Sequence, residues 1–174
     1  MKNKMIKITL CFVLIFEIGC GKLKDDELSI QRRNYIGNEL RTDGYFYYYN
    51  QQHYVERIVV YLLYRNGIIR TCGSPVSFQD FENKIDVYSN GSSTKNEWGV
   101  FVVENDNIKY EKWYGARFLE SYITYIYAGK ILNDTTFHIT ESYYSGTKET
   151  KQINEVWHFK QSANKPDSTN VYIK

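Results

Sequence analysis

The chain is poor in cysteine, and its cysteines cannot form a disulfide inside the folded part. Of three cysteines in 174 residues, Cys11 and Cys20 belong to the N-terminal twenty residues and Cys72 stands alone in the remainder. A domain of this length can bury enough surface without a crosslink, so we expect packing to hold it together. Cys72 matches no local catalytic motif, and we interpret it as a small side chain at a strand end.

The N-terminal hydrophobic run is too short to span a bilayer. The apolar stretch Ile8–Ile18 falls well short of the roughly 20 residues that a transmembrane helix needs. Lysines precede this stretch, and Gly19 and Cys20 close it. A basic head, a short apolar middle and a small residue before the cut are typical of a secretory signal peptide, which we place at residues 1–19.

A surplus of positive charge is missing as well. The chain has 22 Lys and Arg residues against 20 Asp and Glu. Loss of residues 1–19, which carry three lysines and one glutamate, leaves 19 of each. Nucleic-acid binding needs a basic surface that displaces counterions from phosphates. We therefore exclude nucleic acid as a partner.

Cys20 carries a first family resemblance. Ile18-Gly19-Cys20 resembles the end of the lipobox of bacterial lipoproteins, which implies acylation of Cys20 and a membrane anchor of two or three acyl chains. The cluster Lys24–Glu27 resembles a signal that sends lipoproteins of one group of Gram-negative bacteria to the cell surface. These resemblances imply a lipid-anchored protein of the cell envelope, in the outer membrane and surface-exposed. Residues 20–43 are then the lipidated N-terminus and a flexible tether. The alternative interpretation of the charged cluster is that it is no export signal and simply keeps the tether solvated and disordered.

The body of the chain alternates strand and turn signals. Runs rich in β-branched and aromatic residues predict eight strands, at 44–49, 57–64, 68–71, 98–104, 108–113, 121–131, 136–144 and a last one ending at Phe159. Asn66-Gly67 predicts a hairpin with a type I′ turn, and Asn105–Asn107 predicts a second turn. Since closure alone removes strand edges, we predict a mainly β domain over residues 44–174. It is an antiparallel eight-stranded up-and-down meander that closes into a barrel and ends in a polar C-terminal tail.

Alternation along the strands predicts which side chains face inward. In the last strand one face carries Ile153, Glu155, Trp157 and Phe159. In the strand before it, Phe137 and Ile139 share the inner face. The strand at 57–64 is apolar on both faces, so we expect it to be covered twice, by the barrel interior and by a helix.

One segment has helical spacing. Its apolar residues lie three or four positions apart, on one face of a helix: Phe78, Phe81, Ile85 and Tyr88. Ser77 is the predicted N-cap. We therefore expect one short amphipathic helix near residues 78–88.

The order and spacing of the predicted strands show a second family resemblance. Trp98–Glu104, Ile108–Trp113 and Gly129–Ile139 resemble the strand cadence of small lipocalin-like bacterial lipoproteins of uncharacterised function. The resemblance implies a lipocalin-like barrel, and it transfers no catalytic residue. A barrel of eight strands is just wide enough to be filled by side chains or to hold one ligand.

The sequence contains no motif that we can assign to catalysis, a cofactor or a metal. His53, His138 and His158 lack zinc-ligand spacing, although the last two would share an outer face if their strands pair. Glu104 and Glu111 flank one hairpin as a glycosidase pair could, and we interpret both as solvated acids. A nucleophile elbow, a phosphate-binding loop and a dinucleotide fingerprint are missing. We expect a protein that is not an enzyme, without a cofactor or a metal.

Aromatic side chains are abundant: 17 tyrosines, nine phenylalanines and three tryptophans. Such rings suit a cavity for a small apolar or glycan-like ligand, and the candidates to line it are Trp113, Tyr125, Tyr127 and Trp157. Aromatic residues also simply favour strands. Two functions therefore remain open. One is a ligand-binding lipoprotein barrel, and the other is a surface accessory protein that docks an envelope partner and has a packed interior.

Overall fold

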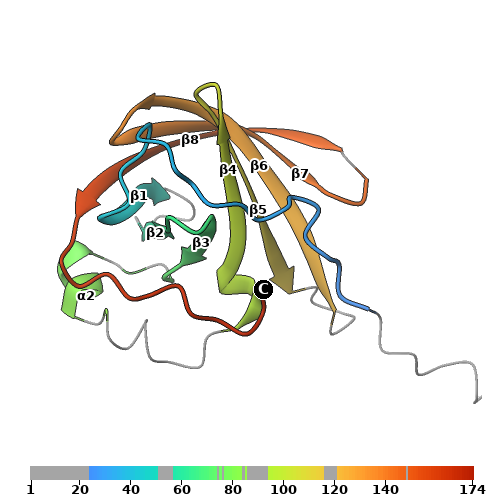
Figure 1. Ribbon diagram of the computed structural model, residues 1–174, viewed down its shortest axis with the longest axis horizontal. Coiled ribbons are helices and arrows are strands. Elements are labelled where there is room, and N and C mark those ends of the chain that lie inside the picture. The colour runs from blue at the N-terminus through green and yellow to red at the C-terminus, as the bar shows by residue number, and fades with distance from the viewer. Residues whose placement is uncertain are drawn as a thin grey trace, which may run out of the picture.

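The computed structural model describes residues 24–50, 57–73, 75, 77–83, 85, 94–115, 121–147 and 149–174 (Figure 1). The predicted signal peptide, Cys20, His53 and Tyr88 lie outside these residues, so the predictions about them stay predictions. In the described part of the chain, no helix is long and apolar enough to cross a membrane.

Eight antiparallel strands form one closed barrel, in which each strand pairs with the next and the last pairs with the first. Their bounds are β1 (Gly44–Asn50), β2 (Arg57–Leu63), β3 (Ile68–Thr71), β4 (Trp98–Glu104), β5 (Asn107–Gly115), β6 (Tyr122–Asn133), β7 (Thr136–Tyr144) and β8 (Thr150–Gln161). The barrel closes where β1 pairs with β8, with Phe46 opposite Phe159. This confirms the predicted eight-stranded meander that closes into a barrel.

The barrel wall has an apolar layer on each side. In β2, Tyr61 and Leu63 belong to the inner cluster of buried residues, whereas Val60 and Leu62 belong to the outer one. The inner cluster also contains residues that alternation predicts to face inward: Phe137, Ile139 and Trp157. The prediction that β2 is covered on both sides is therefore confirmed.

The helix α2 (Phe78–Asn83) covers part of the outer cluster. Ser77 caps it, because its Oγ accepts a hydrogen bond from the backbone N–H of Asp80 at 3.1 Å. Phe81 and Ile85 are buried in the outer cluster, and Phe78 packs against it. The structure confirms a short amphipathic helix over Phe78–Asn83 and its N-cap, while the predicted end near residue 88 lies outside the described residues.

The C-terminal segment packs on the barrel as well. Tyr172 and Ile173 lie against the outer cluster. The ammonium of Lys165 donates to the carbonyl oxygens of Thr42 and Leu63 and lies 4.3 Å from the ring centre of Tyr64. The predicted tail is polar in composition, yet a few apolar and long side chains dock it on the barrel.

The two ends of the barrel differ. At the plug end, where β4 turns into β5 and β6 into β7, Tyr35 and Leu40 complete the inner cluster. The N–H of Leu40 donates to the hydroxyl of Tyr35 at 2.7 Å, and the N–H of Tyr35 donates to the carbonyl of Arg65 at 2.8 Å. At the opposite end, which we call the mouth end, β5 finishes and β6 begins. The segment before β1 therefore closes one end of the lumen.

The strap, residues Lys24–Ile30, lies along the outer face of β5 and β6 (Figure 1). It starts at the mouth end, where the N–H of Asp26 donates to the carbonyl of Tyr122 at 2.8 Å. The prediction that residues 20–43 form a flexible tether is therefore wrong from Lys24 onward. Asp25 and Asp26 look like solvated acids in the sequence, but their carboxylates accept hydrogen bonds from backbone N–H groups of β6.

Of the two predicted hairpin turns, the one at Asn66-Gly67 differs in type from the prediction. Between β2 and β3, the N–H of Gly67 donates to the carbonyl of Tyr64 at 2.9 Å, and Gly67 has a φ of +79° whereas Asn66 keeps a negative φ. This fits a type I turn followed by a left-handed glycine. Between β4 and β5, Asn105 and Asp106 have φ of 50° and 60°, as a type I′ turn requires. The type I′ prediction for Asn66-Gly67 is wrong.

Replacing Gly67 by alanine is expected to destabilise the protein by about 2 kcal/mol. A Cβ at this position would lie 2.1 Å from the carbonyl oxygen of Arg33, and the positive φ disfavours any side chain. Gly115→Ala is the matched control, because the nearest atom to its Cβ would be 4.0 Å away. Urea unfolding measures both variants, and equal stabilities would contradict this account of the turn.

Candidate functional site

The four aromatic residues expected to line the lumen do not all lie there. Trp157 belongs to the inner cluster, and Tyr127 packs against it. Tyr125 is half-buried, with its ring centre 5.4 Å from that of Tyr114. Trp113 instead belongs to the outer cluster, and its Nε1 donates to the carbonyl of Asp26 at 2.8 Å. The expectation that Trp113 faces the lumen is therefore wrong, while a ligand-binding role for the other three stays a prediction.

The register of β5 explains this placement. Ile108 and Tyr110 face the lumen, so Lys112 faces it too and the next residue, Trp113, points outward. Charged and aromatic side chains occur on both faces of this strand, so its sequence pattern does not say which face is inside. Lys112 could therefore not be assigned to the lumen from the sequence, although it stands between Tyr110 and Tyr114.

Lys112 brings an amine into the lumen at the mouth end. Its side chain is only 3% exposed, and its Nζ is hydrogen-bonded to Oγ1 of Thr71, the last residue of β3. The Nζ lies 4.6 Å from the ring centre of Tyr61 and 5.7 Å from that of Tyr114. The amine is thus surrounded by rings and one hydroxyl, an environment that stabilises a cation much less than water does.

Burial shifts the protonation of two facing groups. It lowers the pKa of Lys112 to about 7, because the charged amine is removed from water. It raises the pKa of Glu155 for the same reason, while hydrogen bonds from Trp157 and Tyr48 oppose that rise. The attraction between Lys112 and Glu155 also opposes both shifts. The lumen therefore contains a basic group whose pKa is lowered to about 7 and an acidic group whose pKa is raised.

Aromatic rings surround these two groups. The rings of Tyr61 and Trp157 are stacked, with centres 4.2 Å apart, and those of Tyr110 and Tyr127 are stacked at 4.8 Å. The hydroxyls of Tyr114 and Tyr127 are 2.8 Å apart. The buried hydroxyl of Tyr110 has no hydrogen-bond partner among the described residues. The site thus combines flat apolar faces with polar groups at their rims.

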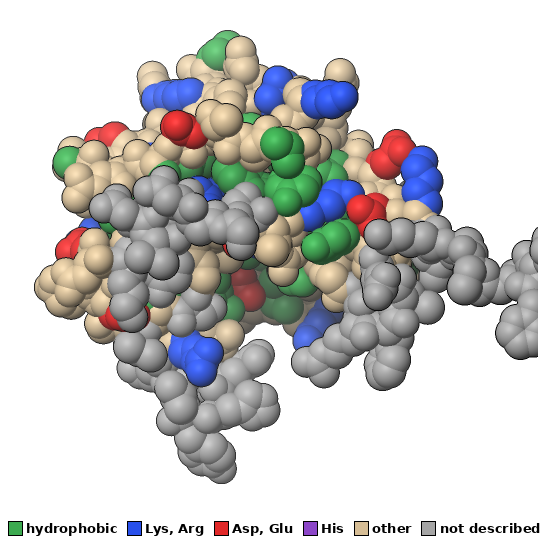
Figure 2. Space-filling view, turned by 90° about the horizontal axis from the view of Figure 1, so that it is seen from below, with side chains coloured by type: hydrophobic (Ala, Val, Ile, Leu, Met, Phe, Trp, Pro, Cys, Tyr) green, Lys and Arg blue, Asp and Glu red, His purple; other side chains and the backbone are tan. Residues whose placement is uncertain are grey.

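The lumen is packed toward the plug end and hollowed toward the mouth end. Near the plug end, Phe46 and Phe137 are almost fully buried, with ring centres 4.9 Å apart. Figure 2 shows the face at the mouth end, where the surface is hollowed at its centre and hydrophobic side chains lie in the hollow with acidic atoms among them. The polar groups of the lumen therefore lie in the half that is not filled by the plug.

The other candidate residues lie elsewhere. Burial raises the pKa of the Cys72 thiol to about 12, which keeps it an unreactive thiol in the outer cluster. His138 is hydrogen-bonded to Asn154 at 2.7 Å. Within the described ranges, no three His, Cys, Asp or Glu side chains come together as metal ligands would.

The two hairpin glutamates have different surroundings. Glu104 is exposed and forms an ion pair with Arg33. Glu111 is fully buried under the strap, where its Oε2 accepts hydrogen bonds from the backbone of Ser29 and Ile30 at 2.7 Å. The interpretation of Glu111 as a solvated acid is therefore wrong, since the sequence does not reveal a segment 80 residues away that covers it.

These features define a class of structure: a closed up-and-down barrel that is plugged at one end and carries polar groups in the other half of its lumen. Comparison with protein-family models, with curated proteins and with solved structures found no match to the chain. The resemblance to lipocalin-like lipoproteins therefore stays a prediction.

Proposed function

We propose that this protein is a lipid-anchored envelope protein whose barrel binds a small amphipathic molecule in the mouth half of the lumen. The observation that carries the proposal is the burial of Lys112 among tyrosine rings inside the barrel. A buried amine costs stability, and such costs are common at binding sites. The narrower ligand classes expected from the sequence, apolar or glycan-like, both fit flat aromatic faces.

The chemistry of the site favours a ligand with an acidic group. The ammonium of Lys112 can pair with an anion, and an anion beside it would favour its protonated form. The stacked rings of Tyr61 and Trp157 offer an apolar face for the body of the ligand. A charge-assisted hydrogen bond in a desolvated site contributes about 1.5–3 kcal/mol.

The anchor belongs to the same proposal. A basic head, a short apolar run and the Ile18-Gly19-Cys20 sequence support export and acylation of Cys20. Two or three acyl chains would hold the protein stably on a membrane. We place it in the outer membrane, exposed at the surface, on the basis of the Lys24–Glu27 cluster.

Two dyes of similar shape test the lumen site. Anilinonaphthalene sulfonate carries an anion, and phenylnaphthylamine is neutral. We expect Lys112→Met to weaken binding of the anionic dye by roughly tenfold or more, and that of the neutral dye little. In the unsubstituted protein, affinity for the anionic dye should fall as pH rises through 7, since Lys112 loses its proton. Fluorescence titration from pH 6 to 9 measures both effects.

Lys109→Met is the matched control, since Lys109 lies on the same strand but is exposed on the outer face. Equal loss in both variants, or no binding of either dye by the unsubstituted protein, would contradict the proposal. The second result would favour the alternative, an accessory protein that docks an envelope partner. The outer surface offers a place for such a partner, a groove of about 580 Å³ next to Trp113 and Tyr172.

A further inference from the structure

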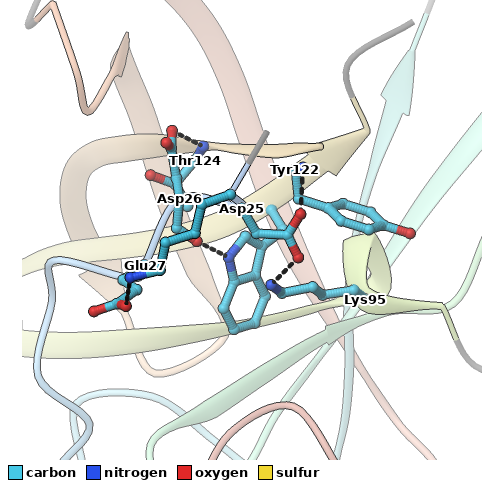
Figure 3. A network of polar contacts seen from close by, with 8 residues as sticks. Asp25, Asp26, Glu27, Lys95, Tyr122 and Thr124 are labelled. Atoms are coloured by element: carbon cyan, nitrogen blue, oxygen red, sulfur yellow. Dashed lines mark hydrogen bonds and ion pairs between the residues drawn. The ribbon is translucent and has the colours of Figure 1, made fainter. Parts of the chain in front are cut away.

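The strap is fixed to the barrel by backbone and side-chain hydrogen bonds (Figure 3). Besides the backbone bond of Asp26, the carboxylate of Asp25 accepts the N–H of Tyr122 at 3.0 Å, and that of Asp26 accepts the N–H of Thr124 at 3.3 Å. Lys95 forms an ion pair with Asp25 at 2.7 Å. These bonds attach the strap to the first residues of β6 and to Lys95, which lies just before β4.

Partial burial makes this attachment firm. The side chains of Lys95 and Asp25 are 18% and 35% exposed, so their ion pair is better shielded from solvent than a surface pair. The indole of Trp113, which donates to the carbonyl of Asp26, is 5% exposed. Asp25 and Asp26 are therefore structural residues of the folded domain.

The contacts place the strap at the mouth end. Tyr122 is the first residue of β6 and pairs with Gly115, the last residue of β5. Lys95 lies just before β4. The chain therefore enters the folded domain beside the mouth of the lumen, at the same end as Lys112 and Tyr114.

The distance from Cys20 to this point is short. Lys24 is the fourth residue after Cys20, and an extended chain covers at most about 14 Å over those four steps. A flexible tether over residues 20–43 would instead have a root-mean-square length of about 25 Å and would let the barrel turn freely. The docked strap removes that freedom.

We infer that the mouth end of the barrel faces the bilayer surface, so that the lumen exchanges its ligand with the membrane. This inference rests on the proposed function, and in particular on acylation of Cys20. The strap holds the barrel by its mouth end within about 14 Å of the anchored residue. The ligand class that this arrangement serves is a membrane-soluble amphiphile with an acidic group. The plug end then points away from the membrane.

Fluorescence quenching in vesicles tests the orientation. One label is attached at Thr147→Cys, in the exposed turn between β7 and β8 at the mouth end, and one at Leu132→Cys, which is 58% exposed at the plug end. Cys72 is buried and does not compete for the label. A strand of nine residues such as β7 spans about 30 Å, so the two labels report different heights.

The full-length acylated protein is placed in phosphatidylcholine vesicles that contain nitroxide-labelled phospholipid. We expect the label at position 147 to be quenched several-fold more than the label at position 132. The double variant Asp25→Ala, Asp26→Ala should reduce that difference, because it removes the three side-chain contacts that fix the start of the strap at the mouth end. Lys24→Ala is the matched control, since that side chain is 84% exposed.

The outcomes separate the two proposals. Equal quenching of both labels in a protein that stays on the vesicles overturns the orientation and leaves the anchor standing. Stronger quenching at position 132 also overturns it. Cys20→Ser should remove the protein from vesicles and abolish quenching of both labels. Vesicle binding by that variant at the level of the unsubstituted protein would overturn the proposed anchor instead.

Discussion

Lys112→Met should make the barrel more stable at pH 7, by about 4 kcal/mol, although it removes an ammonium that contacts three side chains. The reason is the cost of burial: the amine has an ordinary pKa of 10.5 in the unfolded chain and a pKa of about 7 in the folded one. Methionine has a similar length and no such cost. The folded protein is thus less stable because it keeps the amine of Lys112 in the lumen.

The sign of the pH dependence follows from proton binding. Between pH 7 and 10.5, Lys112 is protonated in the unfolded state and mostly neutral in the folded state, so the unfolded state binds more protons. The contribution of Lys112 to the stability of the folded protein therefore becomes less unfavourable as pH rises across this window. The advantage of Lys112→Met should shrink to about 1 kcal/mol at pH 9.5. Burial also lowers the pKa of Lys165 to about 8, but this group contributes equally to the pH dependence of both proteins.

Urea unfolding at pH 7 and at pH 9.5 measures the effect. Lys109→Met is again the control, because an exposed lysine should change stability by less than about 0.5 kcal/mol at either pH. A Lys112→Met protein that is less stable at pH 7 would show that the amine stabilises the fold, and would remove the main support for a binding role.

Glu111→Ala should have the opposite effect and destabilise the protein by about 3 kcal/mol. The Oε2 of Glu111 accepts three hydrogen bonds from the strap, from the N–H and hydroxyl of Ser29 and the N–H of Ile30, at 2.7, 3.0 and 2.7 Å. The alanine variant leaves these donors facing a cavity in place of a carboxylate. Glu111→Gln keeps an acceptor oxygen and should lose only about 1 kcal/mol.

Urea unfolding and hydrogen exchange of the Ser29 and Ile30 amides test this ranking. Exchange at both amides should be faster in Glu111→Ala than in the unsubstituted protein, because the strap is released. Glu104→Ala is the control, since its ion pair with Arg33 is exposed and contributes at most about 0.5 kcal/mol. An alanine variant at position 111 as stable as that control would mean that the strap does not support the fold.

Most of the barrel could be predicted from the sequence because its signals are local. Strand lengths follow from alternation and turn residues, so the predicted limits of β3, β4 and β7 coincide with the observed ones. The type of the turn was harder to predict from the sequence. Asn66-Gly67 has the composition of a type I′ turn, yet the carbonyl of Arg33 packs against Gly67, and only the folded chain brings these residues together.

The candidate site could be predicted only in part, since it depends on contacts between distant strands. The inward face of β8, with Glu155 and Trp157, followed from alternation. The inward face of β5 did not, because Lys112 and Trp113 are both plausible on either side until neighbouring strands fix the register. The strap was missed for the same reason: the groups that bind Asp25 and Asp26 belong to Tyr122 and Thr124, nearly 100 residues later.

The pairing of β1 with β8 has a consequence for how the chain acquires its structure. Gly44 lies opposite Gln161, so the ring closes between the first and last strands of the domain. The entropy of bringing such distant segments together opposes closure until nearly all other contacts are in place. A nascent chain that has not yet released β8 therefore has no complete barrel to adopt, and closure must wait until Gln161 has left the ribosome.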